Sequence, residues 1–207
     1  MEDQGVATED HVILAWLQAE IESVAFQQYI AGDPPNPAFL AQVLKAARKP
    51  NLGDAEQNRV RREIVKKTHG FGLGTLSFEG LANDIRWRKL RVPSVEMGEL
   101  LYASRHPAWA VLAPVSRKVA EGAANVGHVF TGDLTNMLVL ALALRICESD
   151  LVPVLPEVIC LERPDGRMVI LEGHTRATAI VREAHRFKKG VSIYAGASPS
   201  ISNWAYL

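Results

Sequence analysis

The sequence has little cysteine, no excess of charge of either sign, and no apolar run long enough to cross a membrane. Its 207 residues include two cysteines, Cys147 and Cys160, which are too few for a disulfide framework or a zinc ribbon. Lys and Arg (23) balance Asp and Glu (23), and this zero net charge argues against a dedicated binder of long nucleic acids. The most apolar stretch, residues 137–144, is too short to span a bilayer.

What remains is the composition of an ordinary globular protein. Apolar residues make up 48% and charged residues 22% of the chain, as expected of a sequence that folds around its own core. The chain begins with a polar, acidic stretch without the apolar core of a signal peptide, so we expect a cytoplasmic protein with no membrane partner. In that reducing compartment, Cys147 and Cys160 are expected to be half-buried thiols.

Residues 1–75 are predicted to form an N-terminal helical segment. Apolar residues recur at three- to four-residue spacing after Thr8, which is expected to cap the first helix. Asn36, followed by proline, predicts a second helix over residues 38–48, and Asp54 is expected to cap a third. The glycine-rich residues 69–75 are interpreted as a linker, because they follow a helix rather than a strand and no Gly-Lys-Ser/Thr comes after them.

The third of these helices carries a run of cations. They are Arg59, Arg61, Arg62, Lys66 and Lys67. Because Glu56 and Glu63 are interleaved with them, a solvated face is favoured over a nucleic-acid patch.

Residues 76–207 are predicted to form a second domain that contains both helices and strands. The expected helices cover residues 96–102, 117–124, 137–147 and 175–187. The expected strands cover residues 84–92, 157–162, 167–171 and 191–194. Arg163-Pro-Asp-Gly166 is a strong turn signal that joins the middle two strands into a hairpin. The predicted fold class is therefore α+β.

The last part of this domain contains a turn suited to phosphate binding. A strand is followed by Glu172 and Gly173, and a helix then begins. The first N–H groups of a helix lack internal partners, and the helix dipole adds positive charge there. Arg176 can grip a phosphate bidentately, Thr175 offers a hydroxyl, and His174 can donate a hydrogen bond or move a proton near neutral pH. Glu172 can hold a metal ion or accept a substrate proton. From the spacing alone, a surface ion pair between Glu172 and Arg176 with an exposed His174 is equally compatible with this sequence.

This turn and the hairpin before it resemble a known superfamily. Val158-Ile-Cys-Leu and the run from Asp165 through Glu172-Gly173-His174-Thr175-Arg176 to Ala179 resemble the nucleotide-binding core of the ParB/sulfiredoxin superfamily. The resemblance covers roughly residues 134–195, and it implies a small mixed sheet with flanking helices. The N-terminal helices lie outside it.

The residues between Gly173 and Arg176 distinguish branches of that superfamily. Sulfiredoxins carry Gly-Cys-His-Arg, so His174 in place of the reactive cysteine argues against their chemistry. Partition proteins carry Gly-Glu-Arg-Arg and bind cytidine triphosphate while clamping DNA. Free serine kinases carry Asp-Gly-His-His-Arg, the pattern that Glu172-Gly173-His174-Thr175-Arg176 matches best.

The kinase resemblance implies a phosphotransferase that uses ATP or ADP with Mg²⁺ on a small hydroxylated metabolite. It implies catalytic roles for Glu172 and His174, nucleotide contacts from residues 173–176, and a metal contact from Glu172. It also implies an upstream catalytic glutamate, for which Glu96 or Glu99 is the candidate. Arg117, expected at a helix start after Ser116, is either a second phosphate ligand or a surface arginine.

A second function from a different class remains open. The same turn could bind a nucleotide and signal to DNA or to a protein partner, as partition proteins do, with the N-terminal helices as the interaction module. Zero net charge makes DNA the weaker partner, and a homo-oligomer is compatible with either function.

Overall fold

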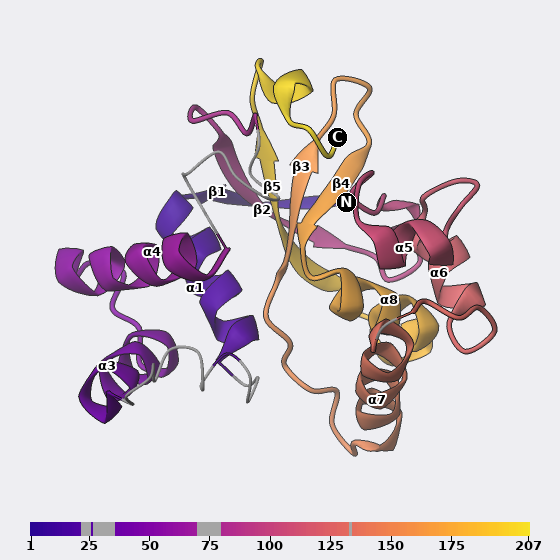
Figure 1. Ribbon diagram of the computed structural model, residues 1–207, viewed down its shortest axis with the longest axis horizontal. Helices are drawn as coiled ribbons and strands as arrows, with labels where there is room; N and C mark the ends of the chain where they lie inside the picture. The colour runs from indigo at the N-terminus through magenta and orange to yellow at the C-terminus, as the bar shows by residue number, and fades with distance from the viewer. Residues whose placement is uncertain (22–25, 27–35, 70–79, 133) are drawn as a thin grey trace.

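The computed structural model describes residues 1–21, 26, 36–69, 80–132 and 134–207, which fold around one five-stranded sheet (Figure 1). The strands in chain order are β1 (Glu2–Ala7), β2 (Arg86–Val92), β3 (Val158–Glu162), β4 (Met168–Glu172) and β5 (Val191–Ala197). Their order across the sheet is β1-β2-β5-β3-β4. β3 and β5 run parallel and the other neighbouring pairs are antiparallel, so the sheet is mixed and the α+β prediction is confirmed.

Helices lie on both sides of this sheet (Figure 1). On one side are α1 (Glu9–Glu20), α3 (Pro37–Arg48) and α4 (Ala55–His69). On the other are α5 (Pro107–Leu112), α6 (Val119–Asn125), α7 (Thr135–Glu148) and α8 (His174–Arg182). Single 3₁₀ turns are formed by η2 (Glu96–Glu99), η3 (Ala184–Arg186) and η4 (Ile201–Asn203).

The alternation of side chains along β3 accounts for the two helical layers. Ile159 and Leu161 belong to the core that contains the N-terminal helices, whereas Val158 and Cys160 belong to the core that contains α5–α8. All four residues are buried. A central strand that is buried on both faces has no polar positions, which explains the unbroken apolar run in this part of the sequence.

The N-terminal helices begin where their capping residues predict. The Asn36 side chain accepts a hydrogen bond from the Phe39 N–H at 3.0 Å, and the Asp54 carboxylate accepts bonds from the first turn of α4. The prediction of a purely helical N-terminal segment omits β1, which pairs antiparallel with β2 along the edge of the sheet. β1 is polar and mostly exposed, so its sequence lacks the apolar alternation that marks a strand. The predicted boundary at residues 75–76 lies outside the described residues.

In the second half of the chain, the strands and the hairpin are confirmed, and three helical segments differ from expectation. The helix predicted over residues 96–102 is only the single turn η2, because Leu101 bonds Met168 and Ile170 on the open edge of β4. Ser94, just before that segment, donates to the Ala184 carbonyl at 3.0 Å and does not cap a helix. Helix α8 ends at Arg182, earlier than predicted. Helix α5 starts with a proline at its first position and is absent from the sequence prediction.

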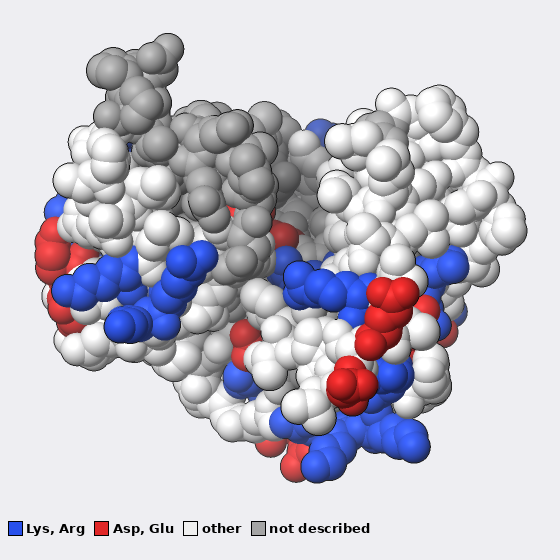
Figure 2. Space-filling view, turned by 90° about the horizontal axis from the view of Figure 1, so that it is seen from below, with Lys and Arg blue, Asp and Glu red and all other residues white. Residues whose placement is uncertain are grey.

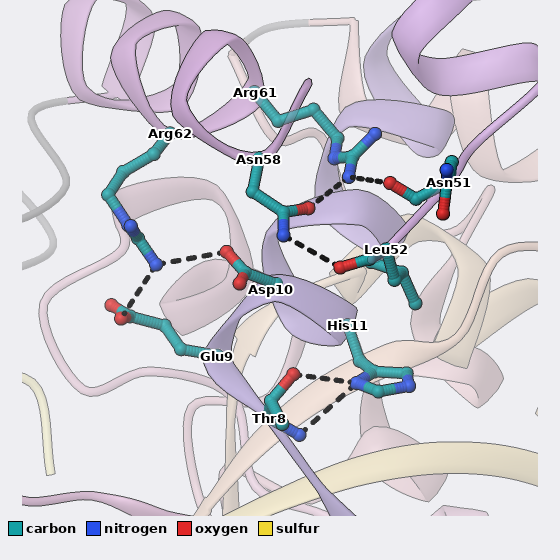
Figure 3. A network of polar contacts seen from close by, with 9 residues as sticks. All are labelled: Thr8, Glu9, Asp10, His11, Asn51, Leu52, Asn58, Arg61 and Arg62. Carbon is teal, nitrogen blue, oxygen red and sulfur yellow. Dashed lines mark hydrogen bonds and ion pairs between the residues drawn. The ribbon is translucent and has the colours of Figure 1, made fainter. Parts of the chain in front are cut away.

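Arg61 corrects the interpretation of α4 as a solvated cationic face. Its side chain is fully buried between α3 and α4, where it donates to the backbone oxygens of Ala46 and Asn51 and to the Asn58 side chain (Figure 3). Burial lowers the pKa of this guanidinium. Arg62 beside it bonds Asp10 at 2.9 Å and so ties α4 to α1 (Figure 3). Two of the predicted surface cations therefore hold the N-terminal helices together.

The two cysteines also differ from the expected pair of half-buried thiols. Cys160 is completely buried in β3, and burial raises the pKa of its thiol, whereas Cys147 is exposed at the end of α7. Both are free. A buried thiol with a raised pKa is chemically inert, so Cys147 is the thiol open to reagents.

Candidate functional site

The turn between β4 and α8 has the conformation that its glycine permits. Gly173 has φ +98°, in the left-handed region, and it stands at the N-cap of α8. A Cβ atom there would lie 2.9 Å from Nη2 of Arg176 and 3.3 Å from the Cα of Val158. Glycine suits this position for two reasons. It adopts the left-handed backbone angle without strain, and its missing side chain leaves room for the guanidinium of Arg176. We call the space beside Gly173, which any side chain at this position would fill, the cradle of the turn.

The start of α8 is open to an acceptor. Its cap residue, Gly173, has no side chain that could accept a hydrogen bond from the first N–H groups. The first bond closed at this end runs from the N–H of Ala177 to the Gly173 carbonyl at 2.8 Å. Thr175 is partly exposed in the first turn. The first N–H groups and the positive end of the helix dipole together favour an anion at this position.

Arg176 folds back under the same turn and pairs with Glu172. The two side chains form an ion pair four residues apart and are only 12% and 16% exposed. Arg176 also donates to the backbone oxygen of Glu157 at 3.3 Å, and the Glu157 carboxylate in turn binds Lys89 of β2 at 2.5 Å. The ion pair that the spacing allowed is therefore the arrangement present. It is less exposed than a surface pair, and it links the turn to the central strands.

His174 is enclosed in a cluster of rings. Its imidazole stacks on Trp109 at 5.5 Å between centroids, and it lies 6.0 Å from the Tyr102 ring and 5.4 Å from His106. Within the described part of the chain, its Nε2 atom is buried and has no hydrogen-bond partner. Burial, followed by the charges of His106 and Arg176, lowers the pKa of His174 to about 3. The ring is therefore neutral near pH 7 and is not the exposed residue of the surface-pair alternative, and its expected role as a proton carrier stays a prediction.

Tyr102 and Thr178 link this ring cluster to the backbone of His174. Both are buried, and the Tyr102 hydroxyl lies 2.8 Å from Oγ1 of Thr178, which donates to the His174 carbonyl at 2.7 Å. Burial raises the pKa of the Tyr102 hydroxyl, so it stays protonated and donates to Thr178. Sequence reasoning assigned no site role to Tyr102, Trp109 or His106. Their contacts with His174 come from distant parts of the chain, and only the i, i+3 spacing of His106 and Trp109 hints at a shared face.

The structure does not bring Glu96 or Glu99 to the turn. Ser94, two residues before Glu96, binds the chain just past the C-terminal end of α8, whose nine residues span about 14 Å. Glu96 is 3.2 Å from the amino group of Met1, and Glu99 is 2.7 Å from Nζ of Lys118. Ser94 therefore places Glu96 near the end of α8 opposite Gly173, and among the contacts of the described residues none joins Glu99 to the turn. The placement gives no support to either as the catalytic acid.

The side chain of Arg117 lies near the end of the sheet that carries the β3–β4 turn. It has φ +61°, which is rare for a residue with a side chain, and its guanidinium donates to the backbone oxygens of Tyr102 and Leu207. Burial and the charges of Arg163 and Arg167, which flank the β3–β4 turn, lower its pKa. Among the contacts of the described residues, none joins Arg117 to the Gly173 turn. It is therefore not a free surface arginine.

The described residues contain no group of three or more His, Cys, Asp or Glu side chains arranged to hold a metal ion. None of the helices described is long and apolar enough to cross a membrane.

No protein-family model, curated protein or solved structure matches this chain. The ParB/sulfiredoxin resemblance therefore rests on the residues of the turn and its hairpin.

Proposed function

We propose that this chain binds the phosphate groups of a nucleotide at the N-terminus of α8, and that it transfers phosphate from ATP or ADP to a hydroxyl group of a small metabolite. The observation that carries the proposal is the cradle at Gly173. A glycine cap offers no side-chain acceptor to the first N–H groups of α8, and the guanidinium of Arg176 lies within 2.9 Å of where a Cβ would be. Backbone donors, the positive end of the helix dipole and an arginine therefore lie together at one turn.

Phosphate binding would act on the Glu172–Arg176 pair. A phosphate carries more charge than a carboxylate and accepts two parallel hydrogen bonds from a guanidinium, so it competes well for Arg176. Glu172 would then be free to bind Mg²⁺. In phosphate sites Mg²⁺ is commonly held by one or two carboxylates together with the phosphates, and a single glutamate at the turn fits that pattern. When bound, the ion would neutralise charge on the phosphates.

The remaining side chains have narrower roles than the kinase resemblance implies. Neutral His174 would set the shape of the turn through its contacts with Trp109 and Tyr102, since its low pKa leaves the ring uncharged near pH 7. Glu96 would take no part, because it lies at the far end of α8. Glu172 is then the only carboxylate of the turn that could orient a substrate hydroxyl. Catalysis would rest on positioning and charge stabilisation, which dominate phosphoryl transfer in general.

Calorimetry with an arginine variant tests the binding step. Arg176→Ala should abolish binding of ATP, ADP and CTP in the presence of Mg²⁺ while the circular dichroism spectrum stays unchanged. Arg59→Ala is the matched control, because Arg59 also pairs with a nearby glutamate but lies on α4, and its nucleotide affinity should equal that of the wild type. Unchanged affinity in Arg176→Ala would refute the assignment of the site.

A nucleotide-gated binding module is the second candidate, and the Glu172–Arg176 pair favours it. Because the pair must open when phosphate binds, the turn would have a paired state and an open state. Helices α1, α3 and α4 lie on the opposite face of the same sheet and offer a separate surface for a partner. Incubation with ATP, Mg²⁺ and a panel of hydroxylated metabolites, serine and threonine included, separates the two functions. ADP with a phosphorylated product supports the transferase. Binding without turnover, together with a salt-sensitive DNA shift, supports the module.

A further inference from the structure

Helix α7 has an apolar face that points away from the core. Val139, Ala143 and Ile146 are buried beneath it, as expected of a helix packed on one side. The opposite face carries Met137 and Leu144, whose exposed fractions are 66% and 56%, where a surface helix would normally carry polar residues. The charged side chains on this helix are confined to its last turn.

The exposed apolar surface continues beyond both ends of the helix. We define the α7 apolar face as Phe130, Leu134, Met137, Leu138, Leu140, Leu144, Leu151, Val152 and Val154, all of which are exposed. The side of the molecule that carries α7 is largely free of charged residues (Figure 2, upper right). At about 100 Å² of apolar area for each fully exposed large side chain, their exposed fractions of 39–98% amount to roughly 600 Å² of apolar surface. The largest patch on a typical monomer is about 300–600 Å².

We propose that the α7 apolar face is the interface of a homodimer in which two copies of α7 pack antiparallel across a two-fold axis. A standard protein interface buries about 800 Å² on each partner, of which about 65% is apolar in homodimers, so this face can supply the apolar part of a stable dimer interface. Met137, Leu140, Leu144 and Cys147 follow one another at spacings of three, four and three residues. That is the spacing of a seam between two packed helices. In the antiparallel arrangement, Met137 of one copy faces Cys147 of the other, and Leu140 faces Leu144.

The dipole of the helix is compatible with a second copy in this orientation. Glu148 ends α7, where the negative end of its own helix dipole disfavours a carboxylate. An antiparallel copy would bring the positive N-terminal end of its α7 beside that carboxylate. The chain has no net charge, so two copies do not repel each other over long range. The face is also self-complementary, as a two-fold interface requires, because apolar residues lie on both sides of its centre.

A membrane surface is a poorer occupant of the same face. Helices that lie in the membrane interface carry several lysines and arginines on their polar side, whereas α7 has Arg145 alone. A vesicle of anionic lipid should therefore not retain the protein.

Analytical ultracentrifugation tests the dimer. The wild type should sediment as a dimer, and Leu140→Glu combined with Leu144→Glu should raise the dissociation constant roughly a hundredfold or more, because each charge would be buried at the seam. Val6→Glu is the matched control, an exposed valine on β1 that should leave the dimer intact. A monomeric wild type, with or without vesicle binding, would overturn the proposal, as would a glutamate double variant that stays dimeric.

Disulfide trapping tests the orientation. Met137→Cys should form a covalent dimer with Cys147 of the partner copy on mild oxidation, and Cys147→Ser in the same chain should abolish it. Within one chain the two positions are about 15 Å apart along α7, too far for a disulfide. Failure of Met137→Cys to cross-link, or a covalent dimer of the wild type through Cys147 alone, would rule out the antiparallel arrangement.

Discussion

Replacement of Gly173 by alanine should destabilise the protein by about 2–3 kcal/mol. A residue with a Cβ at φ +98° costs roughly 1–2 kcal/mol in backbone strain. The new methyl would also lie 2.9 Å from Nη2 of Arg176, at the end of a flexible side chain, so Arg176 should move and weaken its pair with Glu172. Weakening this partly buried charged hydrogen bond adds about 1 kcal/mol, which is part of the roughly 1.5–3 kcal/mol that such a bond contributes. With a urea slope of about 2 kcal/mol per molar, the unfolding midpoint should fall by roughly 1 M.

Gly166→Ala separates the two contributions. Gly166 has φ +79° in the β3–β4 turn, and a Cβ there would meet nothing within 4 Å, so the substitution carries the backbone cost alone. Gly173→Ala should therefore be more destabilising than Gly166→Ala by about 1 kcal/mol. That excess should shrink to the cost of the 3.3 Å contact with the Val158 Cα when both glycine variants are compared in an Arg176→Ala background. Equal losses for the two single variants would refute the claim that Arg176 packs against this glycine.

Three further predictions concern buried groups. Arg61→Met should lower the free energy of unfolding by about 3 kcal/mol, measured by urea titration, because it leaves backbone oxygens of α3 and its following loop without their donor. His174 has a folded pKa below its unfolded value, so stability should fall as pH drops from about 6.5, by up to 1.4 kcal/mol per pH unit. His174→Phe should reduce that slope, and an unchanged slope would contradict burial of the neutral ring. Gly122→Ala, which usually stabilises a helix, should instead cost about 1–3 kcal/mol in thermal unfolding, since the new Cβ would lie 2.3 Å from the Tyr102 hydroxyl.

Local signals in the sequence predicted most of the secondary structure. Asn36 and Asp54 begin their helices because their side chains satisfy backbone N–H groups a few residues away, an interaction that the sequence alone reveals. The β3–β4 hairpin follows in the same way from its Pro-Asp-Gly turn. Strand β1 was missed because it has no buried alternation, and its pairing with β2 depends on residues far along the chain.

The candidate site was predictable at its turn but not around it. Gly173 and the spacing of Glu172 and Arg176 were sufficient to raise the ion pair as one alternative. The burial of His174 was not predictable, because Tyr102, His106 and Trp109 reach it from a segment about 70 residues earlier. The direction in which a histidine pKa shifts depends on such neighbours, and so its role as a proton carrier could not be judged from the sequence.

The position of β1 has a consequence for how the chain folds. This strand closes the edge of β2, which lies about 80 residues further along the chain, so the sheet is complete only after the two ends of a long loop have met. A chain still being synthesised would hold β1 without a partner until β2 emerged. A fragment that began after residue 79 would expose both the edge of β2 and the sheet face that α1 and α4 cover. Such a fragment should aggregate through strand pairing at that edge.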